Sequence, residues 1–275
     1  LLSLSIFIYK TFMRHSLSLS VVLPAYNEAQ NISQAITSAV NYLTERQICY
    51  EIIVVNDGST DATKVIVMAL AAINPQIRLI DHPRNLGYGS ALRSGFDQAL
   101  HDYIFLTDSD GQFEISDLDQ FLPFIRDDQG KILSRIVIGY RAKRADFFMR
   151  SLNAWLYHQF VHWVLGIKAK DIDCAFKLFP RSIYQSVRPI ESDGALFSAE
   201  FLLKLQRLSS IEPIVELPVR HFPRKFGAAT GANIKVILKM FWECWQLKRK
   251  KKENYSQDQI QLKPETLSGI NQMRS

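Results

Sequence analysis

The sequence has no apolar run of about 18 residues or more, so it contains no conventional membrane-spanning helix. The most apolar stretch at the start, residues 1–9, is short and ends at Lys10. It also lacks the basic first region and the small-residue cleavage site of a secretory signal. We expect residues 1–17 to form an apolar N-terminal extension.

Cysteine is scarce and shows no pattern. The three residues, Cys49, Cys174 and Cys244, are odd in number and lie far apart. No two of them have the spacing of metal ligands, which argues against a disulfide framework and against a cysteine-based zinc site. This usage is typical of a reducing compartment, and we expect the chain to act in the cytoplasm.

Two common nucleotide-binding motifs are also missing. No Gly-x-Gly-x-x-Gly follows the first predicted strand, which argues against a dinucleotide-binding Rossmann domain. The turn at Gly87 and Gly89 is not followed by Gly-Lys-Ser/Thr, so it is not a phosphate loop of the Walker type.

The positive charge is concentrated in one place. The net charge is +6, and residues 248–252 contribute five positive charges, so the rest of the chain is close to neutral. A nucleic-acid-binding domain spreads its basic residues over a face, so this distribution argues against a nucleic-acid partner. At 47% hydrophobic content, the 275 residues are sufficient to bury a full core.

Predicted strands alternate with predicted helices through the first half. The apolar periodicity predicts helices over 32–43, 62–72, 90–100 and 115–125, and strands over 18–23, 51–55, 77–80, 103–107 and 135–138. The continuous β-branched run at 51–55 is typical of a strand covered on both faces. This order predicts an α/β fold with a mostly parallel sheet and helices on both faces.

Polar residues follow four of these strands, over 24–28, 56–61, 85–89 and 108–112. Ligands of parallel sheets bind beyond the carboxyl ends of the strands, so these residues predict one site. Asp108 and Asp110 flank the small Ser109 and would point the same way from an extended segment. Two such carboxylates repel each other unless a cation lies between them, and Mg²⁺ or Mn²⁺ with substrate phosphates fits that need.

These motifs resemble family 2 glycosyltransferases with the GT-A fold. The resemblance rests on Val-Val-Leu-Pro-Ala-Tyr-Asn-Glu at 21–28, Val-Val-Asn-Asp-Gly-Ser-Thr-Asp at 54–61, Asn-Leu-Gly at 85–87 and Asp-Ser-Asp at 108–110. It spans about 18 to 237 and is greatest for the polyprenyl-phosphate sugar transferases, which are similar to dolichol-phosphate mannose synthase. It implies a nucleotide-sugar donor, a divalent metal ion and an inverting transfer.

The resemblance also implies site residues. Pro24, Tyr26 and Glu28 would frame the nucleoside, and Asp57 would contact the base or ribose. Further nucleotide contacts would come from the metal-binding turn and from basic residues after the fifth strand, namely Asp108, Ser109, Arg141 and Arg150. The metal ligands would be Asp108, Asp110 and Gln112.

The acceptor side is expected further along the chain. The segment 170–177 resembles the family, and we name Asp173 first and Asp171 second as the general base that a hydroxyl acceptor needs. Both could instead cap a turn before a strand. Arg224 resembles a mobile-loop arginine that touches phosphates. The family continues Gly-x-Ser-Lys there, whereas this chain has Gly-Ala-Ala-Thr at 227–230.

The C-terminal part predicts contact with a membrane surface. Over 232–247 the apolar and aromatic residues share one helical face, and the basic run 248–252 follows. This pattern is typical of an interfacial helix on an anionic bilayer, although a helix packed on its own domain would have the same pattern. Residues 253–275 are polar and aperiodic, which predicts disorder.

We therefore expect residues 18–231 to form a glycosyltransferase domain on the cytoplasmic surface of a membrane. It would move a sugar from a UDP- or GDP-sugar to an acceptor, with polyprenyl phosphate as the first candidate. Two alternatives remain open. The chain could be a non-catalytic nucleotide-sugar-binding subunit, or an enzyme for a soluble or glycan acceptor. A partner subunit could also supply the membrane anchor.

Overall fold

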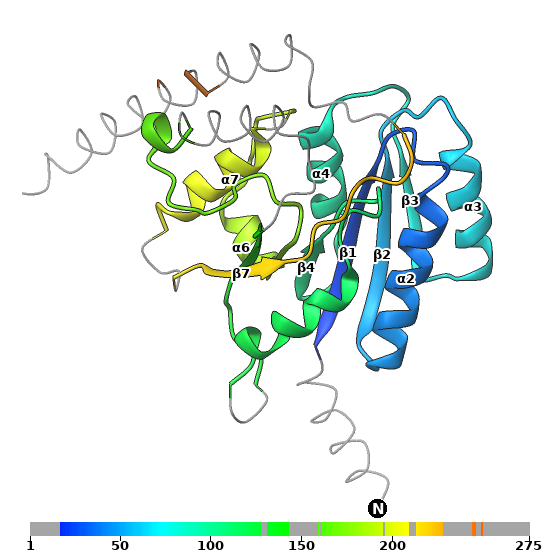
Figure 1. Ribbon diagram of the computed structural model, residues 1–275, viewed down its shortest axis with the longest axis horizontal. Helices are drawn as coiled ribbons and strands as arrows, with labels where there is room; N and C mark the ends of the chain where they lie inside the picture. The colour runs from blue at the N-terminus through cyan, green and yellow to red at the C-terminus, as the bar shows by residue number, and fades with distance from the viewer. Residues whose placement is uncertain are drawn as a thin grey trace, which may run out of the picture.

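The computed structural model describes residues 17–127, 131–142, 159, 161–194, 196–208, 213–227, 244, 245 and 249. In these ranges the chain forms a twisted seven-stranded sheet with helices on both faces (Figure 1). The strands lie in the order β3-β2-β1-β4-β6-β5-β7. Their bounds are β1 Ser18–Ala25, β2 Cys49–Asn56, β3 Ile77–Asp81, β4 Tyr103–Leu106, β5 Val137–Arg141, β6 Lys177–Pro180 and β7 Val215–Val219.

The sheet is mostly parallel, as predicted. Strands β1 to β4 run in one direction, and β6 runs against both β4 and β5. Strand β7 pairs in parallel with β5 at the far edge. The central strands are buried on both faces, and every residue of β2 after Cys49 is buried. Their apolar runs therefore form strands, because side chains on both faces are covered by helices.

Two apolar layers cover the sheet. The helices are α2 Ile32–Glu45, α3 Thr63–Ile73, α4 Tyr88–Asp97, α6 Arg181–Ser186 and α7 Phe197–Leu205, with two short 3-10 helices, η1 Ile115–Gln120 and η2 Leu122–Ile125. One layer joins α4, α6 and α7 to side chains such as Val22 and Ile53. The other joins α2, α3 and the 3-10 helices to their neighbours Val21 and Ile52. Successive strand residues thus face opposite layers.

Three predicted elements differ from the structure in helix type or by more than two residues at one end. The helix predicted over 115–125 is two 3-10 helices, because Pro123 has no N–H to continue an α-helix. Helix α4 begins at Tyr88 and ends at Asp97, earlier than the predicted 90–100. Strand β5 begins at Val137, two residues after the predicted start.

Several predicted segments lie outside the described residues. These are residues 1–16 of the N-terminal extension, most of the helix at 232–252, and the tail 253–275. No helix in the described part of the chain is both long and apolar enough to cross a bilayer.

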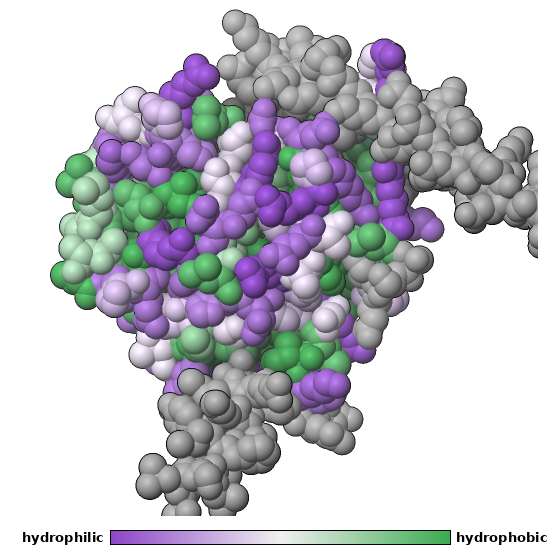
Figure 2. Space-filling model, turned by 180° about the vertical axis from the view of Figure 1, so that it is seen from behind, coloured by the Kyte–Doolittle hydropathy of each residue, from purple (hydrophilic) through white to green (hydrophobic). Residues whose placement is uncertain are grey.

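The outer face of α3 is unusually apolar for an exposed surface. Val65, Met68 and Ile73 are 68%, 53% and 81% exposed. The view from behind shows this as an apolar patch at the left edge of a surface that is otherwise mixed (Figure 2). The patch is separate from the polar edge described next.

Candidate active site at the carboxyl edge of the sheet

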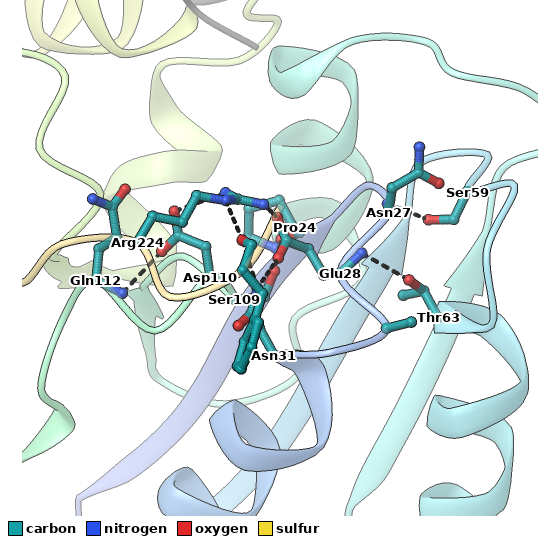
Figure 3. A network of polar contacts seen from close by, with 12 residues as sticks. Pro24, Asn27, Glu28, Asn31, Ser59, Thr63, Ser109, Asp110, Gln112 and Arg224 are labelled. Carbon is teal, nitrogen blue, oxygen red and sulfur yellow. Dashed lines mark hydrogen bonds and ion pairs between the residues drawn. The ribbon is translucent and has the colours of Figure 1, made fainter. Parts of the chain in front are cut away.

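The segments that follow β1, β2 and β4 meet at one edge of the sheet. Because these strands are neighbours and parallel, their carboxyl ends lie together. The Ser109 hydroxyl donates a 2.7 Å hydrogen bond to the carbonyl of Pro24. The backbone N–H of Asn27 donates to the Ser59 hydroxyl at 2.9 Å. These bonds bring three of the predicted polar segments into one surface (Figure 3).

The turn after β1 presents the predicted nucleoside residues. Asn27 has φ 57°, a left-handed conformation that asparagine tolerates better than most residues and that turns the chain toward α2. Tyr26 is 37% exposed, so its ring is available for stacking. Glu28 is buried and accepts a 2.7 Å hydrogen bond from the Asn31 side chain.

Asp57 lies deeper than its predicted contact with a base or ribose suggests. It is buried, and its Oδ1 accepts the backbone N–H of Leu86 at 2.9 Å and contacts Nδ1 of His82 at 2.7 Å. Its Oδ2 accepts the backbone N–H of Gly87 at 2.9 Å. Nε2 of His82 contacts the Ser94 hydroxyl at 2.9 Å. Asp57 therefore anchors the loop that leads into α4, whatever else it binds.

Asp108 and Asp110 form the acidic centre of the edge. Burial, followed by the charge of Asp110, raises the pKa of Asp108 to about 7. The Tyr88 hydroxyl, at the first residue of α4, donates to Asp108 Oδ1 at 3.3 Å. The backbone N–H of Gln112 donates to Asp110 Oδ1 at 3.0 Å and orients that carboxylate.

The acidic pair fits a divalent cation that also binds substrate phosphates. Both groups supply carboxylate oxygens, the donors that Mg²⁺ and Mn²⁺ prefer, and their mutual repulsion is what a cation would relieve. Within the described residues, no three His, Cys, Asp or Glu side chains form a complete metal cage. The predicted ligand Gln112 uses its side-chain Nε2 to bind the carbonyl of Phe222 at 3.1 Å. The cation would therefore depend on Asp108, Asp110 and phosphate oxygens.

Arg224 closes the edge from the other side. Its Nη1 lies 3.1 Å from Asp110 Oδ2, its Nη2 pairs with Glu28 Oε1, and its Nε donates to the carbonyl of Phe226 at 2.7 Å. The guanidinium thus lies between a predicted metal ligand and a predicted nucleoside residue (Figure 3).

A second group of charged residues lies beside this centre. Arg141, at the end of β5, binds Asp171 through two hydrogen bonds of 2.7 and 2.8 Å, and both side chains are largely buried. Burial disfavours the charge of Arg141, but the hydrogen bonds and charge of Asp171 outweigh it and raise its pKa. Asp173 is half-buried, and its charge acts on Tyr88, Arg141 and Lys177. Asp171 is thus committed to Arg141, whereas the charge of Asp173 acts on Tyr88, which contacts Asp108.

Arg150, the remaining predicted contact, lies outside the described residues. The sequence interpretation missed Tyr88 and Lys177. Lys177 is fully buried in β6, opposite Leu106, and its Nζ donates to the carbonyls of Ile172 at 3.0 Å and of Cys174. A lysine within an apolar strand was a signal of this role. Tyr88 had no comparable signal, because its role depends on where α4 begins.

The sequence interpretation also missed a loop that holds the start of α4. The carbonyl of Asp193 accepts the N–H groups of Gly89 and Ser90 at the start of α4. A Cβ at Gly89 would lie 2.4 Å from the carbonyl oxygen of Ser192, so only glycine permits this approach. Glu200 of α7 holds the same loop by accepting the N–H groups of Glu191 and Ser192.

Fold and site together define a GT-A domain, a mostly parallel sheet whose carboxyl edge carries an Asp-x-Asp pair. The chain belongs to glycosyltransferase family 2. The family model described as Glycosyl transferase family 2 matches residues 20–188, which confirms the family suggested by the motifs.

Several curated relatives within this family are named for sugar transfer to lipid phosphates. The chain is 34% identical over 176 residues to a dolichyl-phosphate beta-glucosyltransferase of Trichomonas vaginalis, covering 60% of this chain and 54% of that protein. It is 31% identical over 218 residues to the dolichyl-phosphate beta-glucosyltransferase of Saccharomyces cerevisiae, covering 71% and 65%. A dodecaprenyl-phosphate galacturonate synthase of Rhizobium johnstonii is 28% identical, with 63% and 51% covered. The chain thus spans between about half and two thirds of the length of these relatives.

Solved structures agree on the fold. Glucosyl-3-phosphoglycerate synthase from Mycobacterium tuberculosis in complex with UDP superposes with a TM-score of 0.60 at 19% identity, covering 83% of this chain and 80% of that one. Its complex with Mn²⁺, UDP and phosphoglyceric acid gives 0.57 at 19% identity, covering 76% and 72%. The predicted GT-A fold is thereby confirmed.

Proposed function

We propose that this chain is an inverting glycosyltransferase that moves a sugar from a nucleotide-sugar donor to a polyprenyl phosphate at the cytoplasmic surface of a membrane. The observation that carries the proposal is the acidic pair Asp108 and Asp110 at the polar edge of the sheet, facing Arg224. Relatives named for sugar transfer to dolichyl and dodecaprenyl phosphates support the acceptor class. Solved relatives with UDP-glucose and Mn²⁺ make UDP-glucose the first donor to test.

The donor would lie along the edge from β2 to β4. In this proposal Pro24 and Tyr26 border the nucleoside, and Glu28 and Asp57 lie beneath it. Ser109 holds the metal-binding turn against β1 through its bond to the carbonyl of Pro24. Asp108 and Asp110 would hold Mg²⁺ or Mn²⁺. When bound, this ion would supply Lewis-acid stabilisation of the leaving diphosphate.

The chain's own residues would do the rest of the chemistry. An acceptor oxygen attacks the anomeric carbon as the bond from that carbon to the diphosphate oxygen breaks, and the bonding pair leaves with the nucleoside diphosphate. Arg224 would stabilise the negative charge that grows on the diphosphate. A phosphate acceptor is already ionised and needs little help from a base. A hydroxyl acceptor would give its proton to Asp173.

Arg141 has a supporting role in this scheme. Its guanidinium is held by Asp171, so it contributes fixed positive charge beside Asp173. Lys177 adds a second buried cation behind the same turn, and its backbone contacts hold residues 172 and 174 in place. A preorganised charge of this kind costs no reorganisation during the reaction.

A transfer assay tests the proposal. Purified protein is incubated with UDP-glucose, other UDP-sugars and GDP-sugars, each with polyprenyl phosphate in detergent, and lipid products are identified by mass spectrometry. We expect a glycosyl phosphate lipid, formed with Mn²⁺ or Mg²⁺ and lost with chelator. Asp110→Asn should lower the rate at least about a hundredfold, because it removes a ligand of the metal ion that stabilises the leaving diphosphate.

The controls separate the alternatives. Asp119→Asn removes a carboxylate that pairs with Arg46, away from the site, and should leave transfer unchanged. Phosphoglyceric acid in place of the lipid tests a soluble phosphate acceptor. If product formed only on phosphoglyceric acid, the proposal of a lipid acceptor would be wrong. Binding of UDP without transfer to any acceptor would favour a non-catalytic subunit.

A further inference from the structure

The segment 220–227, here called the strap, crosses the carboxyl edge of the sheet. In Figure 1 it is the orange segment that follows β7 and passes in front of β1 and β2. At its start, Arg220 binds Asp117 through its backbone N–H and its Nε, both at 2.7 Å. In its middle, the N–H of Phe222 donates to the carbonyl of Gln112 at 2.9 Å. Its first half is therefore fixed at η1 and at Gln112, and the strap lies across the proposed donor site.

One side chain of the strap points inward. Arg224 is 18% exposed, and its guanidinium pairs with two buried carboxylates, Glu28 and Asp110. Most of the neighbouring strap residues are exposed, including Phe222, Lys225 and Phe226. Beyond the anchors at Arg220 and Phe222, the ion pairs of Arg224 hold the second half of the strap at the site.

The space around this guanidinium is built for it. Gly227 has φ 82°, and a Cβ there would lie 2.8 Å from Nη2 of Arg224. The Nε of Arg224 donates to the carbonyl of Phe226, and Nδ2 of Asn31 reaches the same carbonyl at 3.4 Å. Glycine at 227 therefore lets the chain fold back over Arg224 and lets the guanidinium reach both carboxylates.

We propose that Arg224 is an internal cation that competes with the divalent metal ion for Asp110, and that donor loading exchanges one for the other. This inference rests on the proposed function, because it assigns Asp110 to the metal. In the ligand-free chain Arg224 neutralises Asp110 and Glu28, and the strap is closed. When metal ion and donor bind, Asp110 would hold the metal ion, and the released Arg224 guanidinium would pair with the diphosphate.

The exchange has a physical advantage. Two buried carboxylates without a counter-charge are costly, so a ligand-free site that lacked Arg224 would be destabilised. The arginine removes that cost when no donor is present. It also makes metal binding weak until a diphosphate offers Arg224 a replacement partner, so metal and nucleotide bind cooperatively.

The sign of one measurement tests the proposal. If Arg224 only helped to bind the donor, its removal would weaken metal binding or leave it unchanged. Arg224→Gln should instead bind Mn²⁺ about tenfold more tightly in the absence of nucleotide, the effect expected if Arg224 covers Asp110 about nine-tenths of the time. Free Mn²⁺ is measured by electron paramagnetic resonance. Lys225→Gln removes the same charge from the adjacent exposed residue and should leave the affinity unchanged.

A second variant covers the case in which Arg224→Gln fails to fold. Gly227→Ala keeps the arginine but places a methyl group against its guanidinium, so it should also tighten Mn²⁺ binding. In the unaltered protein, hydrogen exchange of the peptide that contains the strap should rise with Mn²⁺ alone and fall again when UDP is added.

Unchanged or weaker Mn²⁺ binding in Arg224→Gln or in Gly227→Ala, for folded protein, would overturn the proposal. The proposal would also be overturned if saturating Mn²⁺ left the hydrogen-exchange rate of the strap unchanged. These are binding measurements that need no acceptor. A protein that fails to transfer sugar but shows the exchange would contradict the proposed function and leave this inference standing.

Discussion

Asp57 shows how one residue can serve the fold and the site together. Its carboxylate holds the backbone of Leu86 and Gly87 and contacts His82, so it sets where α4 begins. The first residue of that helix is Tyr88, whose hydroxyl reaches Asp108. Burial, with the charge of Asp108, raises the pKa of Tyr88 well above its usual value, so the hydroxyl stays protonated as a donor. The nucleoside contact predicted for Asp57 remains a prediction.

The two roles of Asp57 can be separated with a matched variant. Asp57→Ala leaves buried N–H groups unpaired and should lower the free energy of unfolding by about 2–4 kcal/mol. If the carboxylate also contacts the nucleoside, the variant should weaken UDP binding in calorimetry. His82→Ala loosens the same loop without removing the carboxylate, so it should cost stability and largely spare UDP affinity. Equal loss of affinity in both variants would reduce Asp57 to a loop anchor.

At the scale of elements, the active edge depends on loops that brace each other. Helix α7 contributes Glu200, which is 2% exposed and accepts the N–H groups of Glu191 and Ser192 at about 3 Å. That loop in turn accepts the N–H groups at the start of α4 through Asp193. Burial tends to raise the pKa of Glu200, but these hydrogen bonds outweigh it and hold the pKa below its ordinary value. An ionised Glu200 therefore stabilises the fold.

This predicts a pH-dependent contribution to stability. Because the folded pKa is depressed, the contribution is complete above the ordinary glutamate pKa of about 4.3 and is lost as the pH falls through the lower folded value. Glu200→Gln should cost about 1.5–3 kcal/mol in urea unfolding at pH 7, and the gap to the unaltered protein should narrow below about pH 4. Glu45→Gln, at an exposed side chain, is the control. A gap that does not change with pH would show that the charge of Glu200 is unimportant.

At the scale of the whole molecule, the proposed lipid acceptor requires that the protein reach a membrane surface. Most of the amphipathic segment 232–247 and of the basic run 248–252 lies outside the described residues. Among those that are described, Trp245 is 52% exposed, and the guanidinium of Arg249 lies 5.0 Å from its ring centroid. An aromatic side chain with a neighbouring cation is typical of a helix at a membrane interface.

Neutralising residues 248–252 should therefore weaken binding to anionic vesicles and leave binding to neutral vesicles little changed. Each basic residue near an anionic surface contributes about 1 kcal/mol, so flotation assays should show a large loss of vesicle binding. High salt should cause a similar loss of binding in the unaltered protein, because it screens the same charges. Turnover of a water-soluble acceptor analogue should be spared. Failure of the unaltered protein to bind anionic vesicles at low salt would mean that this segment packs on its own domain or that a partner provides the anchor.

The sequence alone determined the parallel core of this protein and the family to which it belongs. Strands β1 to β4 and helices α2 and α3 follow from local periodicity, because burial on one or both faces imposes a pattern on neighbouring residues. The polar residues at 24–28 and 108–110 were assigned to one site on the same basis, since parallel strands end at one edge.

Only the tertiary structure decided which partners the charged residues have. Strand β6 enters between β4 and β5 in the opposite direction, and this placement buries Lys177 beneath the turn that carries Asp171 and Asp173. Arg224 meets Glu28 across almost two hundred residues of sequence. Pairings of this kind depend on distances through space between segments that are remote along the chain, and no local pattern of residues encodes them.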